Sequence, residues 1–144
     1  MIEKDTIRLL RECDAGAKMG ISSLEDTMQF TLSEPLKNLL EQSRRQHLTI
    51  AREINDRLVR FEDEGKEPPM IAEIMSKIKA NFKLVTEKTD RAAADLITDG
   101  CNMGIKSLSK YLNQYAAADE YSKDITKKLI SEEEQLSDKL RDFL

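Results

Sequence analysis

The three prolines of this chain limit where its helices can begin and end. Pro35 follows Ser33 and Glu34, which is the pattern of a helix N-cap with proline in the first turn. Pro68 and Pro69 fall in the segment 65–69, which we expect to be a loop because proline removes a backbone donor and clashes with the preceding turn. Between these positions apolar side chains recur every three or four residues, so the sequence predicts long amphipathic helices.

The predicted helices cover residues of about 2–30, 34–64, 71–85, 90–115 and 119–143. The stretch 70–116 has no proline, but one unbroken helix there would be roughly 70 Å long, against roughly 45 Å for the helix at 34–64. That mismatch predicts a break, and Thr86–Asp90 supplies N-cap side chains for it. The expected inward stripe of the helix at 34–64 consists of Leu36, Leu40, Ser43, His47, Ile50, Ile54, Leu58 and Phe61.

Composition agrees with an all-α fold. The 144 residues are 40% hydrophobic and 35% charged, with five glycines, which suits long helices better than sheets or disorder. The length is that of one ordinary domain. We therefore predict a single domain over residues 1–144, with a crossover at about 65–89.

An internal repeat predicts the topology. Residues 16–24, Gly-Ala-Lys-Met-Gly-Ile-Ser-Ser-Leu, match residues 100–108, Gly-Cys-Asn-Met-Gly-Ile-Lys-Ser-Leu, at an offset of 84. Residues 56–61 resemble residues 138–143 more weakly, at an offset of 82. The chain is therefore interpreted as two related helical hairpins joined by a long helical crossover that travels the length of the bundle.

With this layout, this repeat and the Gly-Lys-Glu-Pro loop at 65–68, the chain resembles the ferritin-like superfamily, most closely uncharacterised bacterial ferritin-like domains with a helical crossover. The resemblance covers nearly the whole chain and implies a ferritin-like four-helix bundle. It implies no particular activity.

The di-iron site of ferritin-like oxidases is not expected here. That site needs a Glu-x-x-His motif on each of two helices, and the chain has one histidine, His47, with Arg44 three residues before it. The nearest counterpart in the last helix is Glu132, followed by Gln135 where histidine is required. We therefore expect no catalytic residues and no cofactor.

His47 nevertheless lies on the apolar stripe of its helix. One interpretation is a partly buried histidine satisfied by a neighbouring acid or carbonyl, for which Glu132 is the candidate acid. The alternative is a mononuclear metal site at His47 and Glu132 with one further carboxylate, which would be a weak and unselective ligand set.

Four glycines fall inside the predicted helices, although each costs about 1 kcal/mol relative to alanine. We expect Gly16 and Gly20 to meet Gly100 and Gly104 where the two repeat helices cross closely. The alternative is a pocket for a small apolar ligand beside these glycines, lined by Met19, Ser23, Met103 and Ser107.

The crossover helix carries an apolar stripe that we expect to pack on the bundle or to form an interface with a partner; it consists of Ile71, Ile74, Met75, Ile78, Phe82 and Val85. Cys13 and Cys101 have no metal-ligand spacing and are expected to be buried free thiols.

A net charge of −4 and aromatic residues at 5% favour neither nucleic acid nor a membrane as partner. No signal peptide or membrane span is apparent, so we expect a cytoplasmic protein. The leading hypothesis is a non-catalytic bundle acting by protein–protein contact or self-association. The alternative is a metal- or small-ligand-binding bundle with a site near His47 and Glu132.

Overall fold

The computed structural model describes residues 2–30, 32–61 and 71–144, and all regular structure in these ranges is helical. The elements are α1 (Ile2–Thr27), α2 (Glu34–Arg60), α3 (Ile71–Leu84), α4 (Asp90–Gln114), α5 (Glu120–Leu140) and a final 3-10 turn (Arg141–Phe143). The prediction of an all-α chain with a break before residue 90 is confirmed. The predicted loop at 65–69 and the expected end of the second helix near residue 64 lie outside the described residues.

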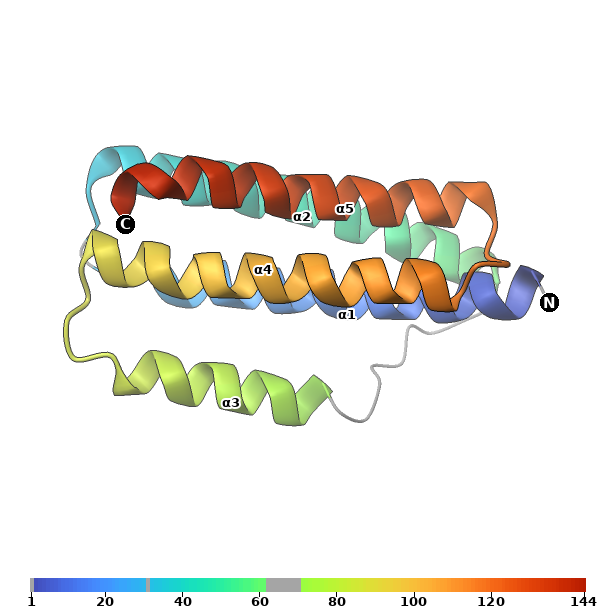
Figure 1. Cartoon of the computed structure of the whole chain (residues 1–144), viewed down its shortest axis with the longest axis horizontal. Coiled ribbons are helices and arrows are strands. Elements are labelled where there is room, and N and C mark those ends of the chain that lie inside the picture. Colours follow the sequence, from blue (N-terminus) through green and yellow to red (C-terminus); the bar gives the residue numbers. More distant parts are fainter. Residues whose placement is uncertain (1, 31, 62–70) are drawn as a thin grey trace.

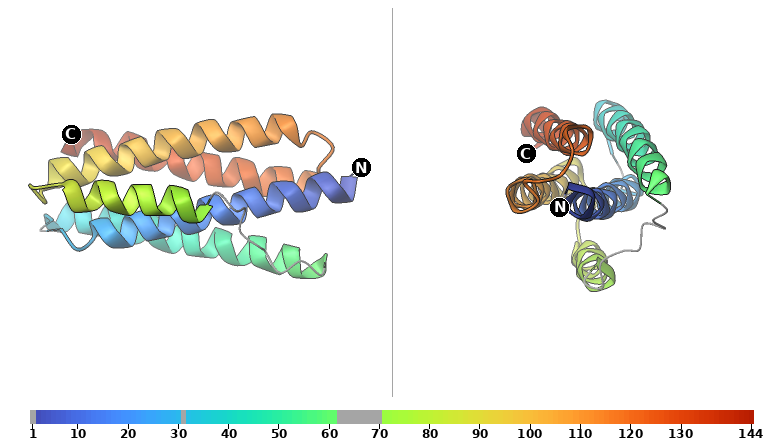
Figure 2. Two further views of the ribbon diagram at one scale, coloured as in Figure 1. Left: turned by 90° about the horizontal axis from the view of Figure 1, so that it is seen from below. Right: turned by 90° about the vertical axis from the view of Figure 1, so that its right-hand side faces the viewer.

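The long helices α1, α2, α4 and α5 pack as a bundle, and α3 lies outside it (Figures 1 and 2). Helices α1 and α2 form one antiparallel pair, and α4 and α5 form a second. Because α2 and α4 run in the same direction, the connection through α3 returns along the length of the bundle (Figure 1). As a result α1 lies antiparallel beside α4, so the two copies of the repeated motif face each other.

Capping residues define the helix starts. Thr89 accepts a hydrogen bond from the Ala92 amide and begins α4, while Asp119 accepts one from the Ser122 amide and begins α5. Ser33 occupies the N-cap of α2 with extended backbone, as predicted, but its side chain makes no capping hydrogen bond. Its amide instead donates to Asp90 Oδ1 at 2.9 Å, which ties the start of α2 to the start of α4.

The core consists of two apolar clusters at the two ends of the bundle. The predicted stripe of α2 is buried from Leu36 to Leu58, as is the α5 stripe that runs from Ile125 to Leu140. One cluster includes Leu24, Leu36, Leu40, Ile97, Leu136 and Leu140. The other includes Leu9, Leu10, Cys13, Ile50, Ile54, Leu108 and Leu129. Each fully buried leucine contributes about 1.5–3 kcal/mol to stability.

Helix α3 packs against α1. Of its predicted apolar stripe, Phe82 is buried with its ring 6.2 Å from the Phe30 ring, and Val85 is half-buried. The side chains of Ile71, Ile74, Met75 and Ile78 lie outside the described part of the structure. None of the described helices has the length and apolar character needed to cross a membrane.

Candidate functional site

A layer of polar side chains separates the two apolar clusters at the middle of the bundle. His47 of α2 and Glu133 of α5 belong to neither cluster, although only 1% and 8% of their surfaces are exposed. The polar side chain of Ser43 is also buried in this layer. Burying an ionisable group is costly unless it is paired. The middle of the bundle is therefore held together by polar contacts between side chains, whereas its two ends are held together by apolar packing.

Both ring nitrogens of His47 have hydrogen-bond partners in the bundle. Nδ1 lies 2.8 Å from the Ser43 carbonyl oxygen, and because a carbonyl can only accept, Nδ1 carries a hydrogen. Nε2 lies 2.5 Å from Glu133 Oε1, so a hydrogen bond joins the two side chains. Burial favours the neutral ring, but the hydrogen bond and charge of Glu133 outweigh it, and the pKa of His47 is raised above 6.5.

The predicted acidic partner of His47 was wrong by one residue. Glu133 makes the hydrogen bond, whereas Glu132 is half-buried and lies against the side-chain amide of Gln46. Burial raises the pKa of Glu132, and its charge reaches His47 without a hydrogen bond between them. Neighbouring residues on a helix point about 100° apart, so Glu132 cannot take the place of Glu133.

The contacts of His47 do not favour the alternative of a metal site at His47 and Glu132. Both ring nitrogens of His47 are engaged, one by the Ser43 carbonyl and one by Glu133. In the ranges that the structure describes, no three His, Cys, Asp or Glu side chains converge as a metal ion requires.

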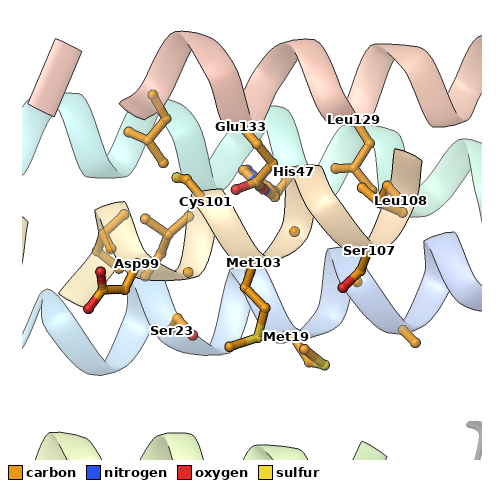
Figure 3. A pocket seen from close by; sticks show the side chains of 18 of the residues that line it. Met19, Ser23, His47, Asp99, Cys101, Met103, Ser107, Leu108, Leu129 and Glu133 are labelled. Atoms are coloured by element: carbon orange, nitrogen blue, oxygen red, sulfur yellow. The ribbon is translucent and has the colours of Figure 1, made fainter. Parts of the chain in front are cut away.

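A cavity of about 250 Å³ lies between α1 and α4, with the His47–Glu133 pair contributing to its wall (Figure 3). Met19 and Ser23 line it from α1, and Met103 and Ser107 line it from α4, as the pocket interpretation predicts. On α1 the lining runs from Glu12 to Leu24, a length of roughly 18 Å. The pocket is thus an elongated space along the facing repeat motifs.

All four glycines line this pocket, and the predicted close crossing at these glycines was wrong. A Cβ atom built on Gly20 would lie 3.0 Å from His47 Cδ2, and one on Gly104 would lie 3.8 Å from the Glu133 carboxyl group. At Gly16 the nearest atom would be Leu108 Cδ2 at 3.8 Å, and at Gly100 no atom lies within 4 Å. The missing side chains therefore leave room for other side chains and for the cavity, not for the backbone of the facing helix.

Several polar side chains in the pocket were not predicted. The Cys101 thiol of α4 is close enough to Glu133 to feel its charge: burial raises the pKa of this thiol, and the nearby glutamates raise it further. Glu12 and Tyr111 line one end of the pocket, and Asp99 lies exposed on α4. The sequence does hold a signal for Glu12, because it shares the helical spacing of Gly16, Met19 and Ser23 on α1.

The two cysteines are both buried and free, as predicted. Cys13 lies 3.0 Å from the Thr126 hydroxyl, and burial raises its pKa to about 12. A thiol must ionise to act as a nucleophile, so neither cysteine is prepared for that chemistry at neutral pH.

Comparison of the chain with protein-family models, with curated proteins and with solved structures finds no match in any of the three.

Proposed function

We propose that this protein is a non-catalytic helical bundle of the ferritin-like type that binds a small, largely apolar ligand in the pocket between α1 and α4. The observation that carries the proposal is the cavity of about 250 Å³ in the middle of the bundle. An apolar cavity of about 150 Å³ holds benzene, so this one has room for a ligand of about ten non-hydrogen atoms.

The antiparallel pairs and the returning crossover support the ferritin-like part of the proposal (Figure 1). The raised thiol pKa of Cys101 and the occupied nitrogens of His47 support a binding role without catalysis. The chemistry of the wall, with apolar and thioether side chains and a few polar groups, is typical of small-molecule pockets.

Contact with a protein partner or self-association stays a separate prediction, for which α3 is the candidate surface. Ligand binding is the stronger proposal because its site is lined by described residues of all four bundle helices.

The test uses 1-nonanol, a linear probe of about ten non-hydrogen atoms. We expect it to raise the melting temperature of the wild-type protein, because a ligand that binds the folded state stabilises it. A Gly104→Leu variant places a side chain in the cavity and should lose this response while folding at least as stably. Leucine at Asn102, which is exposed on the same helix, is the matched control and should keep it. A Gly104→Leu variant that responds to the probe as the wild type does would contradict the proposal.

A further inference from the structure

The ionisable side chains along the pocket are predominantly acidic. Glu12, Asp99 and Glu133 contribute carboxyl groups, and His47 is the one basic side chain among the described residues of the wall, which include no lysine or arginine. Because both ring nitrogens of His47 already have hydrogen-bond partners, this side chain offers no free donor to an anionic ligand. An anion placed there would face carboxylates at close range in a medium of reduced dielectric constant.

Glu133 is the acid best placed to meet a ligand. One of its oxygens, Oε1, takes the hydrogen bond with His47, and the other, Oε2, borders the space beside Gly104. A carboxylate has about four lone-pair sites, so Glu133 can accept further donors. In Figure 3 its carboxyl group and the His47 ring lie together in the pocket wall.

Gly104 leaves space directly beside this carboxyl group. A Cβ atom on Gly104 would lie 3.8 Å from Glu133 Oε2, whereas one on Gly20 would lie 3.0 Å from the His47 ring, which fills the space there. A ligand atom entering slightly deeper than the Gly104 Cβ position comes within hydrogen-bonding distance of Glu133. The remainder of the space runs along Met19 and Met103, whose flexible thioether side chains adapt to an alkyl chain.

Building on the proposed function, we infer that the ligand is a linear alkylammonium-type cation, with its charged nitrogen on Glu133 and its chain along the groove between α1 and α4. The ammonium donates to the Glu133 carboxylate at Oε2, because Oε1 is taken by His47. The alkyl chain of the ligand moves from water to the apolar wall of the pocket, and the burial of its apolar surface supplies most of the affinity. Head-group charge supplies the selectivity, because a neutral or anionic head group of equal size cannot form the same charge-assisted hydrogen bond.

The test compares three probes with about ten non-hydrogen atoms each, namely nonylamine, 1-nonanol and octanoate, by isothermal titration calorimetry at pH 7. We expect nonylamine to bind the wild-type protein at least about tenfold more tightly than 1-nonanol, and octanoate to bind most weakly. The Glu133→Gln variant keeps the shape of the side chain but not its charge, and should bind nonylamine and 1-nonanol with similar affinity.

Two further variants separate the pocket from the general acidity of the protein. Gly104→Leu leaves the net charge unchanged and should abolish nonylamine binding. Asp95→Asn removes one acidic charge at an exposed position outside the pocket lining, and should retain the preference for the amine. The wild-type comparison of the three probes needs no variant, so the inference can be tested even if Glu133→Gln fails to fold.

The possible failures are distinguishable. Equal binding of amine and alcohol, or tighter binding of octanoate, would overturn the cationic ligand and leave the pocket as a binding site. Failure of all three probes to bind would overturn the proposed function itself, and this inference with it.

Discussion

The two copies of the glycine motif have nearly the same sequence but different surroundings. In α1, a Cβ atom added to Gly20 would lie 3.0 Å and 3.2 Å from two atoms of the His47 ring. In α4, a Cβ atom added to the equivalent Gly104 would find its nearest neighbours at 3.8 Å, an ordinary van der Waals distance. The first copy is tight and the second is open.

The difference originates in the partner helices. Gly20 faces α2, which presents an imidazole ring held on both sides by hydrogen bonds, and Gly104 faces α5, which presents a carboxyl group. A repeated motif can therefore keep its position in a fold while its local role changes with the residue opposite. Gly20 is needed to accommodate His47, whereas Gly104 leaves the cavity open.

The largest expected effect comes from removing the side chain that makes the first copy tight. His47→Leu leaves the Glu133 carboxyl group buried without its partner, and breaking a buried pair in this way typically costs about 3–5 kcal/mol of unfolding free energy. Urea denaturation measures it. The double variant His47→Leu/Glu133→Leu should recover most of the loss, because it removes the unpaired charge as well. A double variant no more stable than the single one would contradict the assignment of the cost to Glu133.

The next largest effect is a difference in sign between the equivalent glycines. Gly20→Ala gains about 1 kcal/mol of helix propensity but must displace a ring fixed by two hydrogen bonds, and overpacking of this kind costs about 1–3 kcal/mol. Gly104→Ala gains the same propensity without a clash and should stabilise the protein by about 1 kcal/mol. Chemical denaturation of both variants measures the difference. Equal stabilisation by the two alanines would remove the distinction between the copies.

The starts of the helices could be predicted from the sequence because they depend on neighbouring residues. Pro35 and the Thr89 N-cap act through local chain geometry, so the helix starts at 34 and 90 follow from a few neighbouring residues. The returning crossover could also be predicted from the sequence. The repeat showed two related hairpins, and a single helix over 70–116 would have been too long for a bundle with the helix at 34–64.

The site was less predictable because it depends on contacts between helices. The inward stripe of α5 runs through Leu129 and Leu136, and positions 132 and 133 both fit a period of 3.6 between them. The choice of Glu133 is made by His47 on the opposite helix. In the same way, four glycines at matching positions indicate little side-chain volume, and whether a backbone, a ring or a cavity occupies that volume depends on the facing helices.

A smaller effect is expected from pH, because titration removes one proton and leaves both side chains in place. The folded-state pKa of His47 is raised above 6.5 by Glu133 on α5, with a further contribution from Glu132. A raised pKa means that the folded state holds the proton more tightly, so the stabilisation is complete below about pH 6.5 and is lost as pH rises through the folded pKa.

This effect is measured as the stability of the wild type minus that of His47→Gln, by urea denaturation over a series of pH values. Glutamine can donate to Glu133 but cannot become charged, and subtraction removes the titration of groups common to both proteins. The difference should decrease as pH rises above about 6.5. A difference that increases with pH would show that the histidine is held neutral.

The smallest expected effect concerns the first glycine of each motif, where neither copy is tight. A Cβ atom on Gly16 would lie 3.8 Å from Leu108 Cδ2, and one on Gly100 would find nothing within 4 Å. Both positions are inside helices, so Gly16→Ala and Gly100→Ala should each raise the free energy of unfolding by about 0.5–1 kcal/mol, with little difference between them. Urea denaturation of the two variants, beside Gly20→Ala and Gly104→Ala, completes the set. If the first glycines respond alike and the second glycines respond oppositely, the asymmetry between the copies belongs to the layer of His47 and Glu133. A loss of stability at Gly100 would instead mean that the space beside α4 is filled in solution, and the open character of the second copy would have to be abandoned.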